Sequence, residues 1–228
     1  MMLLWMLACT GVVETDADTD TDTDTDVADA DTDTDTDEPF VSPYAGGWPF
    51  NPDKEALQDP GLGRTIAVGD QVGNFTAVDQ FGESVQLYDF AGHGKPVMLD
   101  ISAEWCLPCQ DIGVWLEGGD EFQTEFLAGF GQYDAVRDAV DAGDLYWITI
   151  LAQDGSGRPA DATSVQRWST NYPHDRIPVL ADDTGAMMFH LDLGFFPSIF
   201  LVDSDMTLIE VPGNADINPP MRAAADRL

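Results

Sequence analysis

Basic residues are scarce in this chain. Nine Lys and Arg residues stand against 42 Asp and Glu residues, and the only lysines are Lys54 and Lys95. The formal net charge of −33 excludes binding to nucleic acid, because contacts to phosphates need cations. It also excludes docking on an anionic membrane surface through a basic patch. We therefore expect protein partners rather than nucleic acid.

Potential metal ligands of the Cys and His types are equally few. The chain has three cysteines, and its three histidines, His93, His174 and His190, are scattered singly. A structural zinc site needs about four ligands, usually with a second Cys or His pair at short spacing. The sequence therefore predicts no metal site, and we expect each histidine to be an ordinary surface or core residue.

Two of the cysteines form a C-x-x-C pair in the segment Trp105-Cys106-Leu107-Pro108-Cys109. The pair follows an apolar, strand-like run and is predicted to open a helix, where free N–H groups and the helix dipole favour an anion. Cys106 is then the attacking thiolate, and Cys109, one turn further on, is the resolving thiol. Trp105 is expected to shield one side of the pair, whose spacing indicates thiol–disulfide exchange.

A single acidic residue, Asp100, interrupts the apolar run before the cysteines. A carboxyl inside a buried strand has a raised pKa and suits proton shuttling. The alternative is an aspartate at a strand end that faces water. The six-residue spacing to Cys106 favours the functional interpretation.

The run from Asp100 to Cys109 resembles the active-site strand and turn of the thioredoxin-like superfamily. The wider stretch 68–211 resembles its redoxin, TlpA-like branch of exported, membrane-anchored thiol–disulfide oxidoreductases and their peroxiredoxin relatives. The resemblance implies that Asp100 accepts a proton from Cys109. It also implies that Pro197 is a cis-proline facing the disulfide, with the Phe196 backbone pairing with a substrate strand. Pro178 is expected to be an ordinary trans proline.

The surroundings of the pair depart from this family in charge. The position after the second cysteine is usually basic there, but here Gln110 is followed by Asp111. Asp100 and Glu104 are also close in sequence, and no Lys or Arg lies within ten residues on either side of the pair. Nearby anions raise the pKa of a thiol. We therefore expect Cys106 to be only moderately acidic, which favours a reductant or exchange catalyst over a strong oxidant.

The N-terminal part divides into three segments before the main domain. Residues 1–9 resemble the end of a bacterial lipoprotein signal peptide, and Cys9 is the predicted lipidation site. Residues 10–38 repeat Thr and Asp, so we expect a disordered, acidic spacer. Residues 39–64 are an irregular leader rich in Pro and aromatic residues, and 65–228 form the thioredoxin-like domain. The predicted location is the cell envelope, on the periplasmic side or the cell surface, attached to the membrane by the lipid only.

The expected fold class is α/β, with a central mixed β-sheet flanked by helices. Strands are predicted at 75–78, 85–87, 97–102, 145–151, 198–202 and 207–211. Helices are predicted from Cys106, once or twice within 122–140, at 162–172 and at 219–228. The stretch 120–142 is interpreted as extra core cover, with a cap over the substrate groove as the alternative. The Gly-rich stretch 153–158 is interpreted as a flexible loop, not a phosphate cradle.

Three functions are consistent with these residues. The first is a monomeric thiol–disulfide oxidoreductase that needs no cofactor beyond the Cys106–Cys109 disulfide. It exchanges disulfides with proteins, and an upstream thiol reductant reduces its own disulfide again. The second is a thiol-dependent peroxidase, which needs a Pro and a Thr or Ser upstream of the cysteine and a nearby Arg. Of these three requirements, the sequence meets only the second, with Ser102. The third is a copper-delivery protein, but carriers of that kind use C-x-x-x-C and a distant His.

Overall fold

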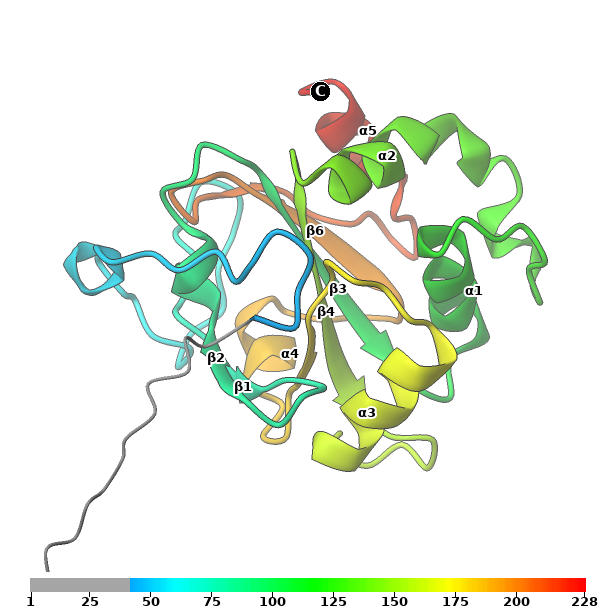
Figure 1. Ribbon diagram of the computed structural model, residues 1–228, viewed down its shortest axis with the longest axis horizontal. Coiled ribbons are helices and arrows are strands. Elements are labelled where there is room, and N and C mark those ends of the chain that lie inside the picture. The colour runs from blue at the N-terminus through cyan, green and yellow to red at the C-terminus, as the bar shows by residue number, and fades with distance from the viewer. Residues whose placement is uncertain (1–41) are drawn as a thin grey trace, which may run out of the picture. The chain divides into compact units, whose positions relative to one another are not determined.

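The computed structural model describes residues 42–228 (Figure 1). The predicted lipidation site Cys9, the segment 1–9 and the spacer 10–38 lie outside the described residues. The described part of the leader, 42–64, contains one short 3₁₀ turn, η1 (Lys54–Ala56), and no strand. Its side chains Trp48, Leu57 and Leu62 pack against the core of the domain.

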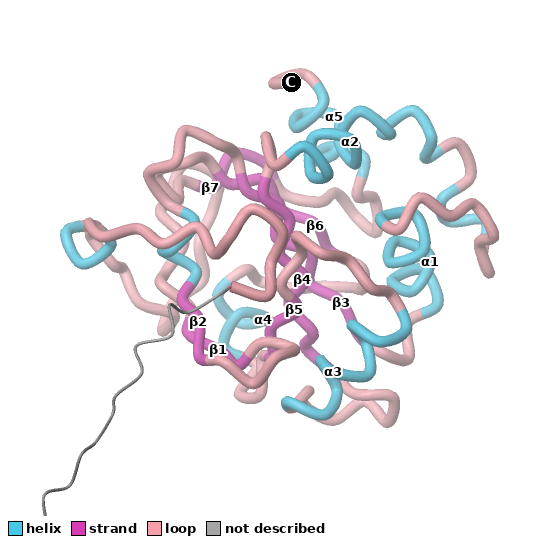
Figure 2. The backbone as a smooth tube through the Cα atoms, in the orientation of Figure 1, coloured by secondary structure: helices cyan, strands magenta, loops and turns pink. Residues whose placement is uncertain are grey.

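A five-stranded mixed sheet lies at the centre of the described chain (Figure 2). Its strands in spatial order are β5 (Val179–Ala181), β4 (Tyr146–Gln153), β3 (Val97–Ala103), β6 (Ser198–Val202) and β7 (Leu208–Glu210). Strand β4 runs parallel to β3 and β5, whereas β6 runs antiparallel to β3 and β7. All seven residues of β3 are buried. The expected α/β class with a mixed sheet is confirmed.

Helices and a hairpin cover the two faces of this sheet. The helices are α1 (Leu107–Leu116), α2 (Asp134–Ala142), α3 (Ala162–Asn171), α4 (Ala186–His190) and α5 (Asn218–Ala225). The hairpin pairs β1 (Thr76–Val78) with β2 (Ser84–Gln86). Short 3₁₀ turns complete the fold: η2 (Leu87–Phe90), η3 (Glu125–Leu127) and η4 (Phe130–Tyr133).

The alternation of side chains along β3 decides what each face contacts. Met98 packs with Ile112 and other residues of α1, whereas Leu99 and Ile101 pack with the hairpin side. Successive residues of a strand point to opposite faces, so Asp100 shares the face of Met98. Asp100 therefore lies on the side of the sheet covered by α1, the helix that carries Cys109.

A glycine in helix α1, Gly113, allows this helix to pack close to the end of α3. A Cβ atom at Gly113 would come within 2.7 Å of Cγ of the Tyr172 ring. Tyr172 is the residue that ends α3. The close approach of the two segments therefore depends on the missing side chain at position 113, because packed interiors leave no room for an added methyl group.

The stretch 120–142 contains α2 and the turns η3 and η4. Its side chains Leu127, Phe130, Tyr133 and Val136 are buried in the cluster that contains α1 residues. The interpretation of this stretch as core cover is confirmed. It also reaches α1 directly, since the Gln123 and Thr124 backbone N–H groups donate to the Asp111 carboxylate at 2.6 and 2.9 Å.

The predicted strands all form, with ends within two residues of those predicted. The sequence-based expectations missed β5 and α4. Strand β5 has only three residues and directly follows Pro178, so a run this short carries no periodic signal. Helix α4 has five residues, which is also too short for a helical repeat of apolar positions to develop.

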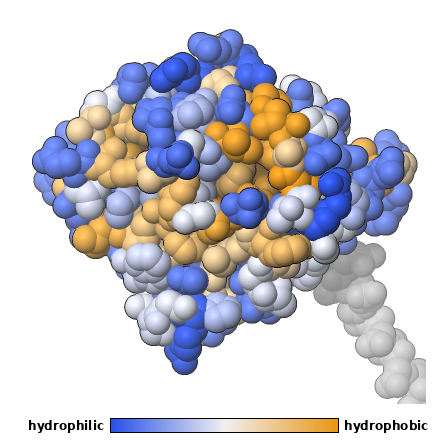
Figure 3. Space-filling view, turned by 180° about the vertical axis from the view of Figure 1, so that it is seen from behind, coloured by the Kyte–Doolittle hydropathy of each residue, from blue (hydrophilic) through white to orange (hydrophobic). Residues whose placement is uncertain are grey.

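Figure 3 shows a rear face on which apolar residues form a broad area bordered by hydrophilic ones. Mixed surfaces of this kind are usual even for very acidic chains, because polar groups cannot cover a whole folded domain. Within residues 42–228 there is no helix with the length and apolar character needed to cross a membrane.

Candidate active site

The two cysteines of the C-x-x-C pair form a disulfide at the N-terminus of α1, with Cα atoms 5.2 Å apart. Cys106 is the N-cap residue, and its Sγ accepts a hydrogen bond from the Cys109 backbone N–H at 3.3 Å. Pro108 occupies the first turn, where a missing N–H costs little. Cys106 is 3% exposed and Cys109 is fully buried. The helix N-terminus and this difference in access both favour Cys106 as the group that meets a substrate.

Asp100 is completely buried in the middle of the sheet. It lies between Thr149 of β4 and Ile199 of β6 in the strand register. Its carboxyl accepts hydrogen bonds from the Ser102 hydroxyl at 2.8 Å and the Thr149 hydroxyl at 3.3 Å. Burial raises the pKa of Asp100 to about 6, and these two hydroxyls offset only part of that effect. A carboxyl with this pKa can both take and release a proton near neutral pH.

The loop before β6 lies against the cysteines. The Phe196–Pro197 peptide bond is cis, and it is the only cis bond among residues 42–228, so Pro178 is trans as predicted. Phe196 packs against the buried cluster that contains both cysteines. The Trp105 ring meets the Phe196 ring edge to face, with centroids 5.8 Å apart. The structure thus brings Trp105 and Phe196 together beside the cluster that contains the disulfide, and the cis-proline Pro197 follows Phe196 directly in the chain.

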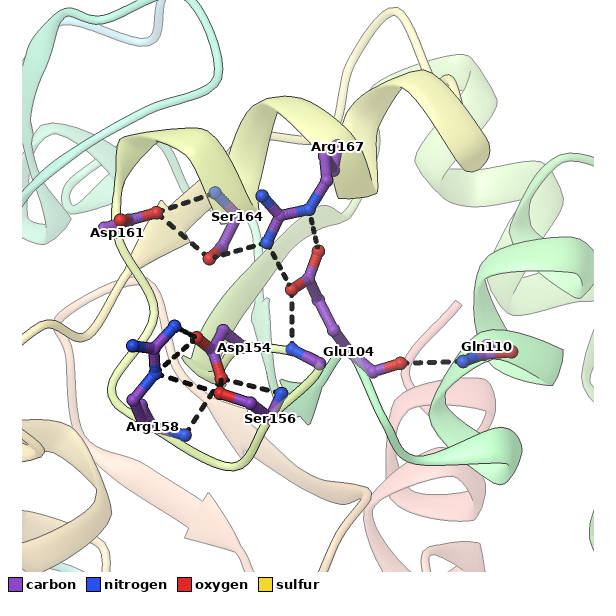
Figure 4. Close-up of polar contacts among 9 residues, drawn as sticks. Glu104, Gln110, Asp154, Ser156, Arg158, Asp161, Ser164 and Arg167 are labelled. Carbon is purple, nitrogen blue, oxygen red and sulfur yellow. Dashed lines mark hydrogen bonds and ion pairs between the residues drawn. The ribbon is translucent and has the colours of Figure 1, made fainter.

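Arg167, a basic residue far from the cysteines in the sequence, lies beside the site (Figure 4). Arg167 on α3 donates two hydrogen bonds to the Glu104 carboxylate, from Nε at 3.0 Å and from a terminal nitrogen at 2.7 Å. Glu104 precedes Cys106 by two residues and its side chain is only 12% exposed. The pairing raises the pKa of Arg167 and keeps its positive charge next to Glu104. Glu104 is thus paired with a cation from outside the ten-residue window around the cysteines, and the moderate acidity of Cys106 stays a prediction.

The Gly-rich stretch 153–158 forms a loop after β4, as predicted, and its predicted flexibility stays a prediction. The Asp154 carboxylate accepts from the hydroxyl and backbone N–H of Ser156 and from the backbone and side chain of Arg158 (Figure 4). These hydrogen bonds hold the pKa of Asp154 well below its usual range, led by the Ser156 hydroxyl. The turn supports the site on two sides: Gly155 N–H donates to Glu104, and Gln153 accepts from the Trp105 indole at 2.8 Å.

The carboxylate of Asp111 is also held by hydrogen-bond donors. It is fully buried, and besides two backbone N–H groups it accepts a hydrogen bond from the Thr124 hydroxyl. The neighbouring Gln110 donates from its side chain to the Glu104 carbonyl at 2.7 Å and accepts from Gln123. All three carboxylates near the cysteines in sequence therefore accept hydrogen bonds from specific donors, and burial raises the pKa of Asp100.

Residues 153–158 and Arg167 were not predicted as parts of the site. Arg167 is a lone arginine on an ordinary helix, and only the packing of α3 against β5 brings it to the end of β3. The one local signal is Asp161, whose carboxylate caps α3 by accepting from the Ser164 N–H at 2.9 Å and so sets where the helix starts. That signal predicts where the helix starts, but it does not predict that Arg167 of this helix pairs with Glu104.

The sheet order β5-β4-β3-β6-β7, with the C-x-x-C pair at the start of the helix after β3 and a cis-proline before antiparallel β6, is the arrangement of the thioredoxin-like fold. The chain has this fold. Within residues 42–228 there is no group of three or more His, Cys, Asp or Glu side chains that could hold a metal. The functional roles of Cys106, Cys109, Asp100, Trp105, Phe196 and Pro197 stay predictions, as does the absence of a cofactor.

Solved structures similar to this chain include thiol–disulfide oxidoreductases and peroxidoxins. The exposed lipoprotein thioredoxin of Streptococcus pneumoniae is 22% identical, covers 68% of this chain and 99% of its own, and has a TM-score of 0.46. A putative thiol:disulfide interchange protein from Chlorobium tepidum is 18% identical over 64% of this chain and 85% of its own (TM-score 0.47). A peroxidoxin from Mycobacterium tuberculosis is 16% identical over 72% and 94% (TM-score 0.47).

No family model matches the sequence, and no curated protein matches it. At identities and scores this low, the similarities to solved structures assign no activity to this chain.

Replacing Asp100 by Asn should stabilise the oxidised protein at pH 7. The pKa of the buried carboxyl is about 6, above its unfolded value of about 3.8, so the native state binds the proton more tightly. Stability therefore falls as the pH rises through this window, and at pH 7 the buried charge costs up to ~3 kcal/mol. Urea unfolding should show Asp100→Asn to be more stable at pH 7 and equal to the wild type near pH 4. The same difference at both pH values would refute the raised pKa.

Removing Arg167 should change the acidity of the Cys106 thiol in the reduced protein. In Arg167→Gln the Glu104 carboxylate loses its cation, so the pKa of Cys106 should rise by about half a unit. Glu104→Gln leaves Arg167 unpaired and should lower that pKa by a similar amount. Thiolate absorbance followed during a pH titration measures both. Arg64→Gln, whose guanidinium pairs with the exposed Asp70, is the matched control and should leave the pKa unchanged. Shifts of the same sign in both test variants would contradict the assignment.

Proposed function

We propose that this protein is a thiol–disulfide oxidoreductase that exchanges disulfides with protein substrates through Cys106 and Cys109. The observation that carries the proposal is the Cys106–Cys109 disulfide at the N-terminus of α1, beside the Phe196–Pro197 loop. The buried Asp100 on the α1 side of the sheet supports it further, because the exchange needs a group that moves a proton.

The first step is attack by the reduced enzyme. The Cys106 thiolate attacks one sulfur of a substrate disulfide, so a Cys106–substrate bond forms and the substrate disulfide breaks. The other substrate sulfur leaves as a thiolate. The N–H groups at the start of α1 stabilise the Cys106 anion before the attack, and the Cys109 N–H already points at its sulfur at 3.3 Å.

The second step resolves the mixed disulfide. Asp100 accepts the Cys109 proton, and the Cys109 thiolate attacks the Cys106 sulfur. The Cys106–Cys109 disulfide forms and the second substrate sulfur leaves as a thiolate. The substrate has gained two electrons and the enzyme has lost two. A thiol reductant outside this chain returns them, and Asp100 returns its proton to Cys109.

The surface around the disulfide suits a polypeptide. Trp105 and Leu107 are 49% and 46% exposed, and both flank Cys106 in the chain. The Phe196 backbone makes no hydrogen bond to any described residue, so its N–H and C=O groups are free to pair with an extended segment. Strand addition of this kind supplies affinity through the main chain and tolerates many side chains.

We place this activity in the bacterial cell envelope, with Cys9 as the lipid anchor. Support comes from the sequence: an apolar segment ending at Cys9 and then an acidic stretch that holds thirteen of the 42 acidic residues between positions 14 and 38. The envelope is a compartment in which thiols and disulfides are actively managed. The protein thus acts there as a reductant or exchange catalyst, as a monomer.

The two cysteines should have separable roles. With an insulin-type protein disulfide and a dithiol donor, Cys106→Ser should abolish turnover because no attacking sulfur remains. Cys109→Ser should also lose turnover but accumulate a mixed disulfide between Cys106 and substrate, detectable by non-reducing electrophoresis and mass spectrometry. Cys9→Ser is the matched control and should keep full turnover with a soluble substrate.

The same proteins distinguish the alternative functions. Consumption of peroxide at a rate comparable to disulfide reduction would favour a peroxidase. Stoichiometric Cu(I) binding by the wild type without reductase activity would favour copper delivery. Either result, or an active Cys106→Ser variant, would refute the proposal.

A further inference from the structure

A cavity of about 270 Å³ lies at the opposite end of the sheet from the disulfide. Lys95 and Tyr146 line it from the segments where β3 and β4 begin, whereas Cys106 follows the far end of β3. Strand β3 has seven residues, so roughly 20 Å separate the two places at about 3.3 Å per residue. Part of the N-terminal leader, from Tyr44 to Pro49, forms one wall of the cavity. The exchange chemistry makes no use of it.

Aromatic rings form much of the lining. The rings of Tyr44, Trp48, Phe90 and Tyr146 follow one another with centroids 5.0–5.2 Å apart. The polar atoms of two of them are bound elsewhere: Tyr44 Oη donates to Asp79 at 2.7 Å, and Trp48 Nε1 donates to Asp89 at 2.9 Å. What these rings offer to the cavity is therefore their apolar surface, which suits a flat apolar group.

Among the described residues, the cavity is lined by basic side chains and by no acidic ones. Lys95, Arg176 and His93 line the cavity, and no Asp or Glu does, although the chain has 42 acidic residues and only nine Lys and Arg. Neither Lys95 nor Arg176 forms an ion pair with any residue of the described range 42–228. Asp144 and Asp175 are next to lining residues in the chain but do not line the cavity, and the Asp89 carboxylate is held by Trp48 and by Lys54 at 2.7 Å.

The Arg176 guanidinium is held in position by the backbone. A Cβ at Gly46 or at Gly143 would come within 2.8 or 2.9 Å of Arg176 Nη1, so both glycines leave the space that this group occupies. Nη1 donates to the Ala45 carbonyl at 3.0 Å, and Lys95 Nζ donates to the Gly143 carbonyl at 2.5 Å. Each cation uses only one of its donors in this way, and a guanidinium has five. The remaining donors are available to a ligand.

We propose that this cavity binds a small aromatic anion. The flat ring lies against the aromatic lining, and its carboxylate takes hydrogen bonds from Arg176 and Lys95. Charge-assisted hydrogen bonds to a carboxylate are the strong ones, and a guanidinium matches carboxylate geometry. The cavity is near the small end of the range for ligand sites, which fits a molecule of one or two fused rings.

The test uses the full chain and a pair of probes that differ in charge. Isothermal titration with 2-naphthoate and with its neutral isostere 2-naphthamide should show the acid to bind at least about tenfold more tightly. Arg176→Gln and Lys95→Gln should each weaken naphthoate binding about tenfold and leave naphthamide binding unchanged. Arg227→Gln removes the same charge at the C-terminal end of the chain and should have no effect.

Three outcomes would overturn the proposal. They are no naphthoate binding at millimolar concentration, equal binding of the acid and the amide, and equal naphthoate affinity in the wild type, Arg176→Gln and Lys95→Gln proteins. The comparison of the two probes uses the wild type, so it stands even if Arg176→Gln loosens the leader. Disulfide exchange by the Lys95→Gln variant should equal that of the wild type, because the cavity lies away from Cys106.

Discussion

The complete burial of β3 is the constraint on which the rest of the structure depends. This strand carries Asp100 in its middle and delivers Cys106 to the start of α1. Burying a carboxyl is costly unless it is hydrogen-bonded or protonated, and here two hydroxyls and a pKa near 6 meet that requirement. The fold thereby keeps a carboxyl with a pKa near neutral on the α1 side of the sheet, shielded from water. In the mechanism that we propose, proton transfer and disulfide exchange therefore depend on the same strand.

The parts of the site that follow from local sequence could be predicted. The C-x-x-C spacing sets one helical turn between the sulfurs, Pro108 marks the first turn, and the apolar run before them predicts a strand. Asp100 stands out because it is the one acid in that run. These features depend only on residues close together in the sequence, so they can be predicted without the tertiary structure. The same holds for the long strands β3, β4 and β6, whose residues are mostly apolar.

The rest required the tertiary structure. Arg167 compensates Glu104 only because parallel β3, β4 and β5 bring α3 alongside, and no pattern within ten residues of the cysteines reveals this. The hydrogen bonds of the loop at 153–158 also required the structure, because Gly and Ser are common in many kinds of loop and do not show that Asp154 accepts several short-range hydrogen bonds. The basic cavity likewise joins the leader, the start of β3 and the segment before β5. The sequence prediction of a mildly reducing pair was built on anions that the structure shows to be partly compensated.

The most direct test of the central claim is the reduction potential of the Cys106–Cys109 pair. The full chain is equilibrated in dithiol and glutathione buffers, quenched and alkylated, and the oxidised fraction is read by mass spectrometry. The account predicts one two-electron transition with a midpoint between about −200 and −300 mV, in the range of exchange catalysts and reductants. A midpoint near −120 mV, typical of a strong oxidant, would contradict the reducing role. No reversible transition at all would contradict disulfide exchange itself.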